Sequence, residues 1–250
     1  MKKIILGMSA VLTYVSASAQ FQETIDSGRP GNSVGVFTVG KNVFQVESGV
    51  DYLENQNLYL SNTLFKYGVT EIIEINGGVA YNFSSNEEVE MFSVGGKFNV
   101  FEGDSMLPST GFQTTLNISN IETENSYASV LFILGYNLDE NWSSTFNLGA
   151  NIDLESSTVI EDSKEKNILF IEGVYTFNLS YKINDKWSTF IEPYGTLDKY
   201  YSPKIKINFN SGLSYLFTKN LKIDFLGGYK INTEEIMIGA GVSWRLTPGT

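Results

Sequence analysis

The residues of this 250-residue chain that could do chemistry are charged side chains set at even spacings within apolar segments. Side chains an even number of positions apart lie on one face of an extended strand. Glu47 and Asp51, for example, share a face opposite Phe44, Val46 and Val50. The following list gives the seven charged residues that we predict to line the interior of a barrel: Glu47, Asp51, Glu74, Lys97, Glu172, Glu192 and Arg245.

Two roles are open to these seven side chains. On a strand that crosses a membrane, Arg or Lys facing lipid costs about 2–4 kcal/mol at the midplane, so charges belong inside. There they could form a polar constriction that selects solutes, as rings of charge do in channels. They could instead pair across the interior and brace an occluded barrel. The sequence leaves both interpretations open.

Catalytic chemistry is poorly supported by the composition. The chain contains no His and no Cys. Without His there is no Ser-His-Asp triad, and the commonest general base and the usual zinc ligand are missing. Without Cys there is no disulfide or thiolate chemistry. The four acidic residues between Leu154 and Lys166 are typical of a solvated external loop. We therefore expect no enzyme activity, no metal and no cofactor.

The elements that would position the charges are strands, because apolar and polar residues alternate with period two through most of the chain. Most segments reach the roughly 9–11 residues of a tilted membrane-spanning strand, whereas sandwich strands usually have about 5–6. This favours an all-β, single antiparallel transmembrane β-barrel over a secreted, soluble β-sandwich. About twelve strands are predicted, at residues 42–53, 57–68, 71–82, 90–101, 111–119, 127–138, 142–153, 167–181, 187–195, 204–217, 221–231 and 235–246.

A repeated hairpin supports the barrel. Four times a Tyr is followed by an apolar residue two positions later and a large apolar residue six positions later: Tyr67-Val69-Ile73, Tyr136-Leu138-Trp142, Tyr181-Ile183-Trp187 and Tyr215-Phe217-Leu221. Tight turns alternating with longer polar connections are typical of outer-membrane barrels, in which the tight turns are periplasmic. Aromatic rings near such turns predict a girdle at the lipid headgroups, formed by Tyr67, Tyr136, Trp142, Tyr181, Trp187, Tyr215 and Trp244.

The N-terminus has the pattern of an export signal. Lys2 and Lys3 precede an apolar run that ends in Ala17-Ser18-Ala19. The run is far shorter than the roughly 20 residues that a spanning helix needs. We predict a cleaved signal peptide at 1–19, an N-terminal periplasmic segment at 20–41 and an outer-membrane barrel at 42–250 of a Gram-negative cell.

The charge balance limits the partners. After cleavage the chain would carry 15 basic and 28 acidic residues. Nucleic-acid binding needs clustered Lys and Arg, so it is not expected. The expected partners are outer-membrane lipids and a small-molecule solute.

Several short motifs, taken in order, resemble the outer-membrane transporter family known as the putative meta-pathway of phenol degradation proteins. They are Arg29-Pro30, the run Phe44 to Asp51, Tyr67-Gly68-Val69-Thr70-Glu71, Gly96-Lys97, Phe190 to Gly195, and Gly239 to Arg245. Lys66 departs from the family, which usually has Arg before Tyr-Gly. The resemblance implies transport of small aromatic or hydrophobic compounds and fixes no substrate.

Together these patterns predict a porin-like outer-membrane channel that passes small, hydrophobic or aromatic solutes by diffusion through its lumen. The alternative is a structural or surface-interaction barrel with an occluded lumen.

Overall fold

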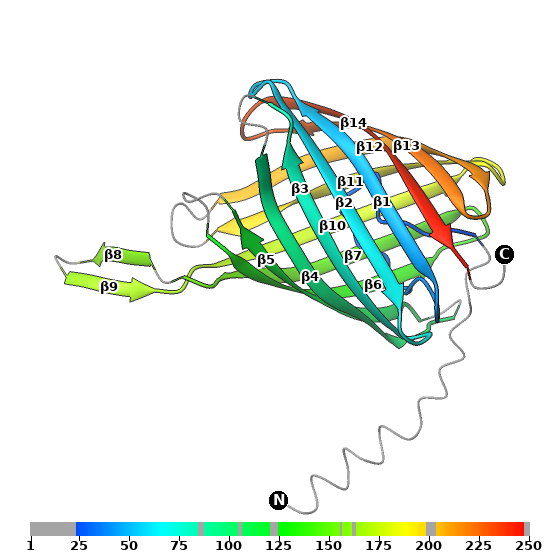
Figure 1. Ribbon diagram of the computed structural model, residues 1–250, viewed down its shortest axis with the longest axis horizontal. Coiled ribbons are helices and arrows are strands. Elements are labelled where there is room, and N and C mark those ends of the chain that lie inside the picture. Colours follow the sequence, from blue (N-terminus) through cyan, green and yellow to red (C-terminus); the bar gives the residue numbers. More distant parts are fainter. Residues whose placement is uncertain are drawn as a thin grey trace, which may run out of the picture.

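The protein is a closed barrel of twelve antiparallel strands (Figure 1), as predicted. The computed structural model describes residues 24–84, 88–104, 107–120, 125–155, 157–161, 164–198 and 204–247. The predicted signal peptide lies outside these ranges. The barrel strands are β1 (Phe44–Leu53), β2 (Leu58–Gly68), β3 (Ile73–Asn82), β4 (Glu88–Phe101), β5 (Ser109–Ser119), β6 (Tyr127–Asn137), β7 (Trp142–Asp153), β10 (Ile171–Lys182), β11 (Trp187–Asp198), β12 (Lys204–Thr218), β13 (Leu221–Lys230) and β14 (Glu235–Leu246).

Each strand pairs with the next barrel strand along the chain, and β1 pairs with β14 to close the wall. At this seam Phe44 lies opposite Leu246 and Leu53 opposite Met237. Closure satisfies the backbone donors and acceptors that a free sheet edge would expose to lipid. The described part of the chain contains no helix that could span a bilayer.

Two further strands lie outside the barrel wall. In the segment expected to be an external loop, β8 (Ser157–Glu161) and β9 (Lys164–Ile168) pair as a hairpin that projects from one end of the barrel (Figure 1). Because residues 167 and 168 belong to β9, β10 begins at Ile171 and not at residue 167 as predicted.

The two faces of the wall differ in polarity. Outward side chains at mid-strand are large, apolar and exposed, such as Val94 (57%), Ile191 (58%) and Ile238 (56%). Inward side chains such as Glu74 and Glu192 are polar and fully buried. Apolar-out and polar-in alternation is the pattern of a barrel that crosses a membrane.

Three of the four repeated hairpins form one kind of turn, and the fourth, between β12 and β13, differs by a register shift between Leu216 and Thr218. In the β2–β3, β6–β7 and β10–β11 connections, the carbonyl of Ile73, Trp142 or Trp187 accepts two backbone N–H groups from the start of the turn. A polar side chain in each turn, from Thr70, Asp139 or Asn184, accepts from two backbone N–H groups at its end. These side chains hold the turns tight by replacing solvent as the acceptor. We call this the short-turn end of the barrel.

Aromatic side chains of the predicted girdle meet across strands at the short-turn end. The ring centroids of Trp142 and Tyr181 are 4.6 Å apart, and those of Trp187 and Tyr215 are 4.7 Å apart. Such pairs contribute about 0.5–1.5 kcal/mol beyond their area burial.

The segment before β1 lies inside the barrel. Residues 24–41 were expected in the periplasm, but they run along the inner face of the wall, where Ile25, Val36 and Val39 are buried. The physical reason is that the segment carries backbone donors and acceptors that polar side chains of the inner wall can satisfy. We call residues 24–42 the collar.

Candidate functional site

The collar follows the inside of the wall from strand to strand. From Arg29 onward its contacts follow broadly the order of the strands around the barrel. The segment also folds back on itself, because a Cβ on Gly28 would lie 3.5 Å from Ser33 O and one on Gly35 would lie 3.2 Å from Asp26 Oδ2. From β13 round to β2, the contacts join Ile25 to Lys219, Arg29 to Asp224, Pro30 to Gly212, Asn32 to Glu192, Val34 to Asn147, Val36 to Gly135 and Gly111, Gly35 to Lys97, Val39 to Glu74, and Asn42 to Gly68.

Glu192 on β11 is the most heavily used anchor of the collar. Its carboxylate accepts the backbone N–H groups of Asn32 at 2.6 Å and Ser33 at 3.0 Å. The side-chain amides of Asn178 and Asn210, on the two neighbouring strands, also donate to it, at 3.1 and 3.4 Å. The side chain is fully buried. Hydrogen bonds to an ionised acceptor are about twice as strong as neutral ones, so this carboxylate fastens the collar firmly.

Two further anchors follow along the wall, one on β7 and one on β3. Asn147 on β7 accepts the N–H of Val34 at 2.7 Å and donates to the carbonyl of the same residue at 3.0 Å. Its side chain thus pairs with the collar much as a neighbouring strand would. Glu74 on β3 accepts the N–H of Val39 at 3.0 Å and lies 3.5 Å from Lys97 on β4. Both anchors form hydrogen bonds with the collar only through its backbone groups.

Arg29 fastens the collar where the barrel closes. Its Nη2 lies 3.3 Å from Asp224 on β13 and 3.9 Å from Asp51 on β1. The guanidinium occupies space that a Cβ at Gly49 on β1 or Gly241 on β14 would fill, because such an atom would collide with it. The glycines let a planar cation lie against the backbone on both sides of the seam.

A second charge pair lies beside the seam. Lys66 on β2 donates to Glu47 on β1 at 2.5 Å, and both side chains are at least nine-tenths buried. Gln45 donates to the same carboxylate at 2.7 Å and to the carbonyl of Asp26 at 2.7 Å. The pair is therefore connected to the collar through Gln45.

Five of the seven predicted interior residues belong to this arrangement: Glu47, Asp51, Glu74, Lys97 and Glu192. The other two lie elsewhere. Glu172 is 3.8 Å from Lys206 on β12, and both side chains are partly exposed. Arg245 donates twice to Asn220 Oδ1, at 3.0 Å, and so holds the turn between β12 and β13.

Sequence reasoning missed the collar itself and the amide side chains that hold it. Asn147, Asn178 and Asn210 each stand on the polar face of their strand, and all three are buried. This recurrence of Asn at strand centres was the available signal. Asn is depleted in strands, so its presence there indicates a specific hydrogen-bonding task.

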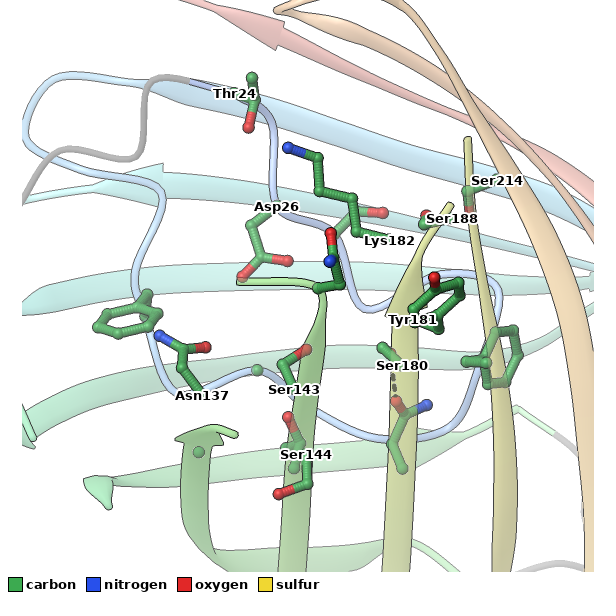
Figure 2. A pocket seen from close by; sticks show the side chains of 18 of the residues that line it. Thr24, Asp26, Asn137, Ser143, Ser144, Ser180, Tyr181, Lys182, Ser188 and Ser214 are labelled. Carbon is green, nitrogen blue, oxygen red and sulfur yellow. Dashed lines mark hydrogen bonds between the residues drawn. The ribbon is translucent and has the colours of Figure 1, made fainter. Parts of the chain in front are cut away.

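A cavity of about 1320 Å³ lies between the collar and the wall. Its lining combines collar residues such as Asp26 with hydroxyl side chains from successive strands, including Ser143, Ser180, Ser188 and Ser214 (Figure 2). It reaches the short-turn end, where residues 138–141 and 184–186 also line it. The barrel thus holds a polar vestibule at this end.

The fold is that of known outer-membrane porins and channels. The chain is similar to the NanC porin (12% identity, 80% of this chain, 100% of that chain, TM-score 0.64). It is similar to the KdgM porin (13%, 81% and 99%, TM-score 0.61) and to the COG4313 outer membrane channel from Pseudomonas putida F1 (9%, 89% and 100%, TM-score 0.54). The predicted outer-membrane location agrees with this fold and with the apolar outer belt.

Sequence comparison assigns the family. No curated protein matches the chain. One family model covers most of it, from the collar to the end of β14, and confirms the resemblance seen in the short motifs. The chain belongs to the family described as Putative MetA-pathway of phenol degradation, whose model matches residues 27–246.

Proposed function

We propose that this protein is a passive channel that lets small solutes diffuse across the outer membrane through the barrel lumen. The observation that carries the proposal is the vestibule of about 1320 Å³ inside a closed barrel with a polar inner face. A polar, hydrated lumen enclosed by an apolar outer belt is the arrangement that lets water-soluble molecules bypass lipid. Known proteins of the same fold include porins and channels, which supports the same class of function.

The lining indicates the chemistry of the solute. Hydroxyl and amide groups predominate around the vestibule, and Phe37 and Phe190 supply apolar surface beside them. The family description points to phenolic compounds. A small aromatic compound bearing hydroxyl groups satisfies both indications, since its ring can contact Phe and its hydroxyls can bond to Ser or Asn. We therefore propose such solutes over purely hydrocarbon ones.

Planar-bilayer recording of the refolded protein tests the channel. Discrete conductance steps in KCl are expected, together with swelling of protein-loaded liposomes in isosmotic catechol. Absence of both steps and swelling from a correctly folded barrel would exclude the proposal. Protein left unfolded in urea and added to the same bilayer controls for leakage.

The second candidate is a structural barrel with an occluded lumen. One specific observation favours it, namely that residues 24–42 occupy lumen space and are fastened by buried carboxylates. The same recording distinguishes the candidates, because an occluded barrel inserts without conducting.

A further inference from the structure

We propose that the collar is the constriction that sets the size limit and ion preference of the channel, and that Arg29 is the residue that locks it in place. The inference rests on the proposed channel function and adds the residues that control it. Three observations carry it: the course of the collar, the setting of Arg29, and the charges around the lock.

The collar narrows the lumen, both by lying against the wall and by folding back so that residues 26–28 lie beside residues 33–35. Twelve strands spaced about 4.8 Å apart and tilted about 40° give a backbone radius of about 12 Å. Inward side chains take about 5 Å of this, half the usual spacing of packed sheets, which leaves an open radius of about 7 Å. A chain lying against the wall takes about 4 Å more. The cross-section at the collar therefore falls at least about fivefold.

Arg29 is the point at which the collar is locked. Its side chain spans the seam between β1 and β14, contacting Asp224 on β13 and Asp51 on β1. Its backbone carbonyl accepts from Lys222 Nζ at 3.1 Å. Both its side chain and its main chain are therefore held by the wall.

The lock also neutralises buried charge. The side chain of Asp224 is fully buried, and within the described residues its oxygens accept no hydrogen bond. A carboxylate in that setting depends on a nearby cation, and Arg29 is 3.3 Å away. Loss of Arg29 would leave Asp224 with Lys222 as its remaining nearby cation and would remove the cation beside Asp51. Water and mobile cations would enter to replace the lost guanidinium, and the collar would be released from the wall.

The first test compares Arg29→Gln with wild type in planar bilayers. The variant should conduct at least twofold better, because the constriction occupies only part of the length of the pore. In a KCl gradient its reversal potential should shift toward cation selectivity. Lys206→Gln is the matched control, since it removes one positive charge from a partly exposed side chain that contacts Glu172 and leaves the collar in place. Heat-modifiable migration in gels confirms that each variant has folded.

A disulfide lock provides the second test. A Cβ placed on Gly135 would lie 3.5 Å from the Cβ of Val36, at the short end of the range that a disulfide bridges. The chain has no Cys, so Val36→Cys with Gly135→Cys forms a single defined bond between collar and wall. Added to Arg29→Gln, it should restore wild-type conductance when oxidised and lose that effect when reduced. The oxidised and reduced states of the same protein are thus compared directly, and each serves as the control for the other.

The outcomes separate the two proposals. Suppose that wild type conducts, and that the protein carrying Arg29→Gln and the two Cys residues, in its reduced form, conducts equally and with the same ion preference. The collar is then not the constriction, and this inference is overturned. If neither protein conducts, the channel function fails. If wild type is silent and the released variant conducts, the collar closes the lumen, which supports the constriction and overturns the open channel.

Discussion

Replacing Glu192 by Gln tests whether the inner wall holds the collar by charge-assisted hydrogen bonds. The substitution keeps the size of the side chain and removes its charge. One of the two carboxylate oxygens becomes an amide NH2 group. This group is a donor, and the groups around it are donors too, so it finds no acceptor there. The backbone N–H groups of Asn32 and Ser33, together with two Asn amides, then compete for a single neutral oxygen.

The size of the effect follows from these bonds. A hydrogen bond to a charged group contributes about 1.5–3 kcal/mol and a neutral one about 0.5–1.5 kcal/mol, so two weakened backbone bonds lose about 2 kcal/mol. A buried donor left without an acceptor adds about 1 kcal/mol or more. The local opening free energy of the collar should therefore fall by about 3 kcal/mol, which accelerates exchange about a hundredfold.

Hydrogen–deuterium exchange with mass spectrometry measures this local opening free energy on peptides spanning residues 30–35, with the protein in detergent or nanodiscs. Exchange of Asn32 and Ser33 should accelerate, while strands β3 and β4 keep their protection. Glu172→Gln is the control, because Glu172 lies on the same face of the wall and contacts Lys206. Equal protection of residues 30–35 in both variants and wild type would refute the view that Glu192 anchors the segment.

Three further predictions concern the wall, each read from urea titrations of folding into lipid vesicles. Val94→Arg places a charge on the lipid face at mid-strand and should lower the free energy of unfolding by about 2–4 kcal/mol. Thr115→Arg, on the inner face of the adjacent strand, should lower it by less than about 1 kcal/mol. Equal losses would contradict the assigned faces. Lys66→Met should destabilise by about 3–5 kcal/mol by leaving Glu47 buried without its cation, and Glu47→Gln in the same chain should recover most of the loss. Trp187→Ala removes a girdle ring pair and should cost at least about 1 kcal/mol, so an unchanged midpoint would exclude a stabilising girdle.

The sequence was sufficient for the wall because the wall depends on local patterns. Alternation along β14 assigns Ile238 to the lipid face and Arg245 to the interior without knowledge of any partner strand. The turn at Asn184 is equally local, since its side chain bonds within three residues. All twelve barrel strands accordingly lie within four residues of their predicted bounds.

The collar could not be predicted in this way, because it has no period and its partners are distant in the chain. Val34 pairs with Asn147 across 113 positions, and Asn32 with Glu192 across 160. Only the closed barrel brings these residues together. For the same reason the charges could be assigned to the interior from their spacing, but the sequence could not distinguish bracing from selection.

The course of the collar also bears on the order of assembly. Arg29 contacts Asp51 on β1 and Asp224 on β13, which lie on either side of β14. Asn32 and Val39 bond to Glu192 on β11 and Glu74 on β3. Only the closed wall brings these partners together, so a complete set of collar contacts reports that the barrel has closed.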